Sequence, residues 1–450
     1  MNPESEKSTL ISPRGESGVL RSLLLLALPA IVQSMMGTLM QYVDTAMVGR
    51  LGEQATAAVS VTTTIGWLLS ALPYSVGIGC VSLISQALGA QEHQKLRESA
   101  MLGVFFGGLI GMVLTALSLL LARYIPGWMQ ADASIRSEAA RYFFIISLPT
   151  LPRCLGTVLA SMLQAVKDTR SPMRASLISN AVNVALNALL IYALGLGVLG
   201  AAIATAVSTL LSAALLLRAF LRTPALRFFR REFVVRRPLA RELLHVALPA
   251  LGTTAASCMG YVVFAGMVSG MGTVVFAAHS IATNAEEIFY IPGYGLRTAT
   301  STLTGIAVGE GNQNKFRAVR RWSVLLTLGM MAVSGAALYF CAPQLMRIFT
   351  SSVAVAELGA RVLRIVAFSE PFFGLMIVWE GISYGLGKTR SVFLVETLSM
   401  WGVRIVLTYF VTQVWHLGLE YVWYCMVADN VCKALALTAV RLRDDAGKYA

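Results

Sequence analysis

The sequence predicts an all-α integral membrane protein of twelve transmembrane helices in two pseudo-symmetric six-helix bundles. Three observations predict this class. Of the 450 residues, 56% are hydrophobic and only 13% are charged, and the mean hydropathy is +0.68. Apolar runs of twenty or more residues recur along the chain, each long enough to cross a hydrocarbon core about 30 Å thick. Blocks of the first half also recur in the second half at a constant spacing.

The apolar runs divide the chain into two sets of six, joined by short connections that leave no room for a soluble domain. The first six fall near Leu20–Val48, Ala55–Leu88, Ala100–Ala122, Ala139–Leu163, Ser171–Leu194 and Val198–Leu217, and the second six near Leu243–Met271, Val274–Val308, Ser323–Cys341, Val362–Tyr384, Val392–Val414 and Leu417–Val440. The expected organisation is a cytoplasmic tail (1–19), an N-lobe of helices 1–6 (20–217), a basic cytoplasmic linker (218–241), a C-lobe of helices 7–12 (242–440) and a second cytoplasmic tail (441–450).

The basic residues predict the orientation of the chain. Of 36 Lys and Arg residues, 25 lie in the tails and the even-numbered connections, and 7 lie in the odd-numbered connections. The positive-inside rule therefore places both termini in the cytoplasm, and we expect the protein to be a multi-pass protein of the inner (plasma) membrane. The eight arginines from Arg218 to Arg241 are expected to face anionic lipid headgroups, so the bilayer is the expected partner rather than nucleic acid. We expect a monomer.

The two halves match at a constant offset of 220 residues. "RSLLLLALPA" at Arg21 corresponds to "RELLHVALPA" at Arg241, and the same offset relates Pro29 to Pro249 and Gly89 to Gly309. Because each half contains an even number of spans, both halves enter the membrane in the same direction and are related by an axis along the membrane normal. Two parallel bundles that face a central cleft are typical of an alternating-access transporter.

Ionisable residues within the apolar runs favour a transporter over a passive scaffold, because each costs about 2.5 to 3.5 kcal/mol on insertion scales. Asp429 and Lys433 have i, i+4 spacing and are expected to pair. Arg404 could neutralise a carboxylate or face lipid phosphates. Further candidates are Glu380 and Glu396, which flank the basic connection "GKTR" and are expected near the headgroups, and Glu370 and Arg297, which could pair with each other or line the cleft.

Asp44 is the acid that is hardest to explain by packing. It lies in "MQYVDTAMVG" among apolar neighbours, with no basic residue within a helical turn, so its partner must come from another helix. In the fifth span Asn180, Asn183 and Asn187 share one helical face through spacings of three and four. Their amides could donate hydrogen bonds to a carboxylate or coordinate a hard cation. The hydroxyl of Thr205 on the sixth span could join them, and the alternative is that the asparagines only bridge helices.

Several motifs resemble the multidrug and toxic compound extrusion (MATE) family, and the likeness covers nearly all of the chain after the first tail. "YVDTAMVGRLG" is similar to the first-helix motif of that family, "LQAVKDTRSP" and "YGLGKTRSV" to its two cytoplasmic turn motifs, and "VADNVCKALAL" to its last helix. "EEIFYIPGYGLRTATSTLTG" resembles the eighth helix of one bacterial branch. The resemblance implies a twelve-helix protein in two lobes that exchanges Na⁺ or H⁺ for drugs.

The resemblance also assigns roles to residues. It implies that Asp44 is the amino-lobe aspartate that binds the coupling cation, and that Asn183, Asn187 and Thr205 belong to the same site. Many members carry aspartate where this chain has Asn187, and Ser257 and Phe373 stand where Na⁺-coupled NorM-type members carry acids. Fewer acids favour H⁺ over Na⁺, so Asp44 would hold a metal ion only if coupling were to Na⁺. No cofactor is expected.

A transport mechanism follows from these assignments. Asp44 would take up a proton from outside and release it when substrate replaces the proton, while Pro29 helps the first helix bend. The substrate would be a bulky, amphipathic, cationic organic molecule held between the lobes. Its expected neighbours are two acids as counter-charge, one cation and an apolar and aromatic surface, namely Glu286, Glu287, Arg297, Met36, Met40, Tyr42, Phe289 and Tyr290.

Two other functions remain open at this point. A lipid or lipid-linked precursor flippase of a related superfamily would use the same parallel bundles but should carry more cleft charge for a pyrophosphate headgroup. A membrane-embedded enzyme is a remote alternative, because the sequence contains no HExxH motif or aspartate dyad. The glycines at 103, 107 and 111 predict close helix packing rather than a nucleotide site.

Overall fold

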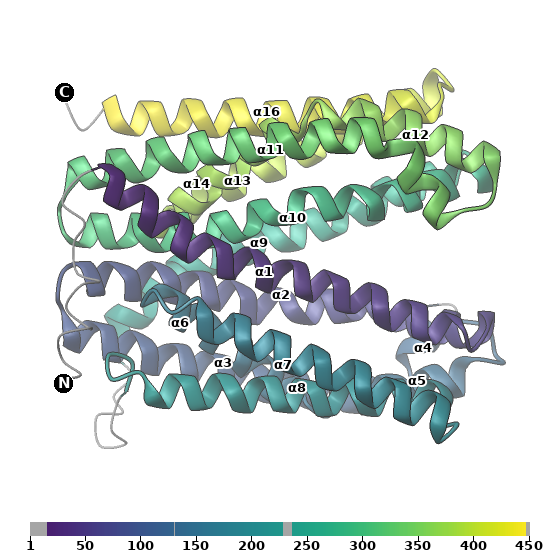
Figure 1. Cartoon of the computed structure of the whole chain (residues 1–450), viewed down its shortest axis with the longest axis horizontal. Coiled ribbons are helices and arrows are strands. Elements are labelled where there is room, and N and C mark those ends of the chain that lie inside the picture. Colours follow the sequence, from purple (N-terminus) through teal and green to yellow (C-terminus); the bar gives the residue numbers. More distant parts are fainter. Residues whose placement is uncertain (1–15, 130, 228–235, 447–450) are drawn as a thin grey trace. The chain divides into compact units, whose positions relative to one another are not determined.

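The computed structural model describes residues 16–129, 131–227 and 236–446, and within these ranges it contains helices and connecting segments but no β-strand (Figure 1). The predicted first tail up to residue 15, the centre of the predicted basic linker (228–235) and the end of the predicted second tail (447–450) lie outside the described residues. The prediction of an all-helical protein is confirmed.

The helices of the first half are α1 (Glu16–Gly49), α2 (Glu53–Gly89), α3 (His93–Leu121), α4 (Ile125–Trp128), α5 (Arg136–Ser147), α6 (Thr150–Ala165), α7 (Arg170–Asn187), the π-helix η2 (Ala188–Ala193) and α8 (Gly197–Arg222). Those of the second half are α9 (Arg237–Ser269), α10 (Thr273–Gly309), α11 (Gln313–Phe349), α12 (Val353–Ala367), α13 (Glu370–Gly385), α14 (Thr389–Ser399), η4 (Met400–Ile405), α15 (Val406–Tyr409), η5 (Phe410–Val414) and α16 (Leu419–Ala446).

Length and composition identify the membrane spans. Among the described residues, eight helices are long and apolar enough to cross a membrane, and two bent pairs, α5 with α6 at 48° and α12 with α13 at 54°, qualify as one span each. The two remaining long helices are α10, with 37 residues, and α16, with 28 residues, both of which carry buried charges. Together these elements account for the twelve predicted spans.

The chain forms two compact units, and three of the four positions at which the chain passes from one unit to the other fall inside helices. Unit 1 comprises the described residues up to Ile31, then Leu88–Gln91 and the chain from Met259 onward, and unit 2 comprises Val32–Ala87 and Glu92–Cys258. The first part of α1 therefore belongs to unit 1 and its second part to unit 2. Pro29 lies at this division, within α1. Because proline lacks the N–H that would bond to the preceding turn, the helix is weakened there.

Unit 2 shows the close packing that its glycines predict. A Cβ atom at Gly103, Gly107 or Gly111 of α3 would meet side chains of α6, chiefly those of Met162, Val158 and Leu151. Glycine at this spacing lets the two helices approach, and larger residues would force them apart. The interpretation of these glycines as packing residues is confirmed.

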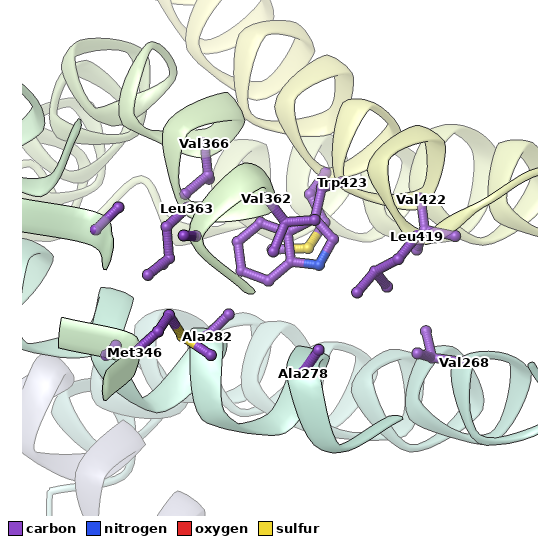
Figure 2. Packing of buried hydrophobic residues seen from close by; sticks show 14 of the residues in the cluster. Val268, Ala278, Ala282, Met346, Val362, Leu363, Val366, Leu419, Val422 and Trp423 are labelled. Carbon is purple, nitrogen blue, oxygen red and sulfur yellow. The ribbon is translucent and has the colours of Figure 1, made fainter. Parts of the chain in front are cut away.

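The core of unit 1 is a dense cluster of aliphatic side chains around one indole (Figure 2). Trp423 of α16 is fully buried, and Figure 2 shows it between Val362 of α12 and the α10 face that carries Ala278 and Ala282. A second cluster joins the first part of α1, through residues such as Leu23, to α10 and α11. These clusters explain why the first turns of the chain belong to unit 1.

The fifth span of each half ends in a π-helix. In the first half η2 directly follows Asn187, and in the second half η5 covers Phe410–Val414. The offset of 220 residues places η2 opposite 408–413, so the two π-helices occupy nearly equivalent positions. π-helical turns are rare and often occur next to functional residues.

Candidate functional site

Asp44 lies on the second part of α1, half-buried, and its partner comes from α7. The Asn187 amide donates a hydrogen bond from Nδ2 to Asp44 Oδ1. The same Nδ2 donates to Asn183 Oδ1 at 2.8 Å. Asn183 and Asn187 are both buried, with Asn187 only 1% exposed. The structure thus brings together three of the four residues expected to form the cation-coupling site.

Two further hydrogen bonds hold the fifth span against α1. Asn180 Nδ2 donates to the Met36 carbonyl oxygen at 2.8 Å, and the Tyr192 hydroxyl donates to the Met47 carbonyl oxygen at 2.9 Å. With the bond between Asn187 and Asp44, α1 is bound at three levels over about three helical turns. Only the central bond has an ionisable acceptor, so only that one changes strength when a proton binds.

The centre of this site holds more acceptors than donors. Asn187 Oδ1 is buried without a hydrogen-bond partner, and the carboxylate of Asp44 has lone pairs beyond the one that Asn187 uses. A buried acceptor without a donor costs about 1 to 3 kcal/mol, which a bound cation or a proton can offset. The geometry therefore suits a group that a cation occupies and leaves.

Tyr142 on α5 belongs to the surroundings of Asp44, although nothing in the sequence pattern selects it. Its phenol interacts electrostatically with Asp44, and its ring is buried in an apolar cluster. That cluster includes Val48, one turn beyond Asp44, and Ile191, one turn beyond Asn187. From the sequence, the single tyrosine in "RYFFIIS" is expected to be a packing residue, and only the fold brings it close to Asp44.

Thr205 lies on α8, half-buried, one turn beyond Ala201, which packs in the same apolar cluster. Its carbonyl oxygen accepts a hydrogen bond from the Thr209 hydroxyl at 2.8 Å. Within the described residues its hydroxyl is not among the hydrogen-bond partners found for Asp44. Thr205 is therefore a neighbour of the site rather than a direct ligand of the carboxylate in this structure.

The potential metal ligands of the described residues are scattered. Among the described residues, no group of three or more His, Cys, Asp or Glu side chains could hold a metal ion together. Any Na⁺ at Asp44 would rely on amide and carbonyl oxygens for its remaining ligands, whereas a proton needs only the carboxylate.

Unit 1 contains a buried ion network around Asp429. Arg404 Nε lies 2.8 Å and Lys433 Nζ 2.9 Å from Asp429 Oδ2, and the Ser399 hydroxyl donates to Asp429 Oδ1 at 2.6 Å. The predicted pairing of Asp429 with Lys433 is confirmed. Of the two alternatives for Arg404, the structure shows the first, neutralisation of a carboxylate. Its guanidinium also lies 5.5 Å from the ring centre of Tyr261.

Arg297 pairs with Glu380, and not with Glu370. The ion pair joins α10 to α13, and the Arg297 guanidinium lies 4.5 Å from the ring centre of Tyr294. Glu380 and Glu396, which we expected near the headgroups, are instead buried inside unit 1. Glu380 can be buried because it pairs with Arg297, and Glu396 can be buried because it lies against the carboxyl group of Glu380.

Glu286 is also buried, on α10, with Arg404, Glu287 and Glu370 in electrostatic reach. Glu370 is 2% exposed, and its Oε2 has no hydrogen-bond partner. Glu286 therefore has two other acids in electrostatic reach, and the one guanidinium in its reach already pairs with Asp429.

The remaining residues expected to bind substrate fall in both units. Met36, Met40 and Tyr42 lie on the second part of α1, in unit 2, and all three are half-buried. In unit 1, the Phe289 side chain packs against the apolar core, and the Tyr290 ring lies 5.0 Å from that of Phe373. Phe289 therefore contributes to packing, while Tyr290 belongs to an aromatic group beside Glu286.

The equivalent of Asp44 in the second half is Phe264, at the offset of 220 residues. Phe264 is buried, 5.7 Å from the Arg404 guanidinium and 5.5 Å from the His279 ring. The carboxylate and amides of the first half are thus replaced by an aromatic ring and a paired arginine. The two halves share a scaffold but not a site.

Comparisons with known proteins agree with this architecture. A sequence model of the MatE family matches residues 29–189 and 249–410, two segments that begin at the repeat-related Pro29 and Pro249. The probable multidrug resistance protein NorM of Thermotoga maritima is 27% identical over 425 residues, 92% of this chain and 90% of that protein.

Two solved structures align over nearly the whole chain. One is an outward-facing multidrug resistance MATE family transporter of the MOP superfamily, with a TM-score of 0.91 at 21% identity, covering 98% of this chain and 100% of that one. The other is a MOP superfamily transporter from Pyrococcus furiosus, with a TM-score of 0.90 at 21% identity, covering 97% and 99%. At these identities the alignments show the shared fold alone.

Proposed function

Because the chain belongs to the MatE family of multidrug efflux transporters, we propose that it exports amphipathic, cationic organic compounds in exchange for protons by alternating access. The family consists of membrane transporters rather than enzymes. The observation that carries the proposal is the hydrogen bond between Asn187 and Asp44, beside a buried amide oxygen that has no donor.

Protonation of Asp44 changes how α1 is held. A hydrogen bond to a charged acceptor contributes about 1.5 to 3 kcal/mol, and one to a neutral acceptor about 0.5 to 1.5 kcal/mol. A proton on Asp44 therefore weakens the central one of the three bonds between α1 and the fifth span. It also turns the carboxylate into a donor, for which Asn187 Oδ1 is an available acceptor. The second part of α1 can then repack, with Pro29 as the point of bending.

Proton exchange supplies enough energy for efflux. Moving one charge through 100 mV is worth about 2.3 kcal/mol, and a tenfold concentration ratio corresponds to about 1.4 kcal/mol. One proton can therefore sustain roughly a fiftyfold gradient of a neutral substrate. When a monocation leaves as one proton enters, the exchange is electroneutral and only the pH gradient drives it.

The proposed substrate contacts combine buried acids with adaptable apolar surface. Glu286 and Glu287 supply counter-charge, and Tyr290 an aromatic face for a cation. Met36, Met40 and Tyr42 supply polarizable surface from α1. Phe289 and Arg297 carry less weight, because Phe289 packs on the core and Arg297 pairs with Glu380. The positive-inside bias supports an orientation in the plasma membrane with both termini in the cytoplasm, and the proposal is for a monomer.

The decisive test is efflux of ethidium from energised cells or inverted membranes, with the pH gradient and the Na⁺ gradient collapsed separately. We expect wild-type efflux to stop when the pH gradient is lost and to persist without Na⁺. Asp44→Asn should abolish coupled efflux, while Asp132→Asn, at an exposed aspartate in the connection before α5, should leave it unchanged.

Each other outcome contradicts part of the proposal. Efflux that depends on Na⁺ alone would assign Na⁺ as the coupling ion. Undiminished efflux by Asp44→Asn would make Asp44 structural and move the coupling role to Glu286. No efflux by the wild type, combined with movement of a fluorescent lipid between leaflets, would favour the flippase.

A further inference from the structure

Two glutamates of unit 1 lie against one another in the interior of the protein. Glu380 of α13 is 4% exposed and Glu396 of α14 is 8% exposed. Their carboxyl groups lie within hydrogen-bond reach of each other. Neither belongs to the site around Asp44, which lies in unit 2. The mechanism proposed above uses neither of them.

The cations that face this pair are largely occupied. Arg297 of α10 forms an ion pair with Glu380. Lys433 of α16 is in electrostatic reach of Glu396, but its ammonium pairs with Asp429 at 2.9 Å. Of the other cations on these helices, Arg404 pairs with Asp429, and Arg441 donates to the hydroxyl groups of Ser383 and Ser391. Among the described residues, Arg297 is therefore the cation seen to form an ion pair with this couple of acids.

Helix packing leaves little room for water beside the pair. A Cβ atom at Gly381, next to Glu380, would lie 2.9 Å from the Arg297 carbonyl oxygen and 3.3 Å from its Cα. One turn later, a Cβ atom at Gly385 would meet the backbone of Ser301. Glycine at both positions seats α13 directly on α10 around the ion pair. Solvent cannot easily screen a second negative charge there.

Two ionised carboxylates in this position would repel strongly. The repulsion between two unit charges grows as their separation and the local dielectric constant fall, and both are small in this buried contact. As a carboxylate, Glu396 would also leave its Oε1 buried without a donor. One proton changes the contact into an O–H···O⁻ hydrogen bond, one of the strong kinds in proteins. The pair then carries one negative charge, which faces Arg297.

We propose that Glu380 and Glu396 form a second proton-binding site, which holds one proton between the two carboxyl groups at neutral pH. The ligand is H⁺, and the geometry that selects it is a contact between two buried acids that share one arginine. The site goes beyond the proposed function, because it exists whether or not the chain exports drugs.

Infrared spectroscopy of the purified full-length protein at neutral pH tests this site without any transport substrate. A protonated carboxyl group has a carbonyl stretch that ionised carboxylates lack. We expect the wild type to show such a band, and we expect it to shift when the protein is made with isotope-labelled glutamate. Glu396→Gln should remove one carboxyl group's intensity, since its amide can still donate to Glu380.

Glu380→Gln should remove the same intensity for a different reason. Without the neighbouring carboxylate, Glu396 faces Arg297 and gives up its proton to pair with it. Glu357→Gln, at an exposed position on α12, is the matched control and should leave the band unchanged. Loss of one carboxyl group's intensity in both variants and full intensity in the control would support the site.

Several results would overturn the inference. They are a band that does not shift with labelled glutamate, a band of full intensity in either glutamine variant, and a band that disappears when Na⁺ replaces K⁺ in the buffer. The last result would mean that a metal ion rather than a proton neutralises the pair. Because each glutamine variant is expected to remove the shared proton, either one keeps the test decisive where the other fails to fold.

Discussion

Replacing Asn187 with aspartate reverses the hydrogen bonding at the centre of the site. The amide nitrogen of Asn187 donates to both Asp44 Oδ1 and Asn183 Oδ1. In Asn187→Asp an ionised carboxylate oxygen replaces this nitrogen and faces the same two acceptor oxygens. The variant loses two donated hydrogen bonds and brings two carboxylates into contact.

The magnitude follows from this contact. Two charges about 3 Å apart repel by about 5 kcal/mol at an effective dielectric constant of about 20. Asp44 is only half-buried, so water lowers this figure, and we expect a destabilisation of about 3 kcal/mol when both acids are ionised. One bound cation between them offsets most of this repulsion. The free Oδ1 of Asn183 is then available as a further ligand.

Thermal unfolding of the purified protein in Na⁺ and in K⁺ at alkaline pH measures the effect. We expect Asn187→Asp to melt below the wild type in K⁺ and to recover in Na⁺ or at acidic pH, and its efflux to become dependent on Na⁺. Asn180→Asp adds the same charge on the same helix face but opposite the Met36 carbonyl group, so it should show no such recovery. Equal stability of Asn187→Asp and the wild type in both salts would refute the proposed contact.

Three further substitutions test the helix framework. Pro29→Ala restores the missing N–H of α1, so we expect higher thermal stability by about 1 to 3 kcal/mol and slower efflux; unchanged efflux would show that α1 need not bend at this residue. Arg404→Met leaves buried Asp429 with one cation fewer and should cost about 3 to 5 kcal/mol, whereas Arg361→Met, in an exposed ion pair, should cost less than about 1 kcal/mol; equal melting temperatures would refute the buried pairing. Gly107→Leu should lower stability by about 3 kcal/mol or prevent assembly, because α6 leaves no space for the side chain, and a wild-type melting temperature would contradict this packing.

The sequence predicted the class of fold and the number of spans well, because a bilayer imposes length and apolarity on every crossing helix. It could not predict where helices would break. The bends between α5 and α6 and between α12 and α13, and the π-helices η2, η4 and η5, depend on packing that periodicity does not report. Nor could it place the division of α1 between two units, although Pro29 pointed to a weak position there.

Part of the site around Asp44 could be predicted from residue spacing along single helices. Spacings of three and four place Asn180, Asn183 and Asn187 on one helical face, and an acid without a partner on its own helix requires one elsewhere. Tyr142 was missed because its approach to Asp44 depends on the position of α5, about a hundred residues further along the chain.

The charged residues of unit 1 show most clearly what could not be predicted from the sequence. Spacing within one helix predicted the pair Asp429 and Lys433, but the partners of Arg297 and Arg404 come from other helices and were left open. Composition, charge bias and the internal repeat by themselves determined a twelve-span protein with two related halves, since these properties need only the local chemistry of each segment. Which acids are ion-paired, which lie against another acid, and which oxygen stays without a donor were decided only by the tertiary structure, because electrostatic energy depends on distances between helices far apart in the chain.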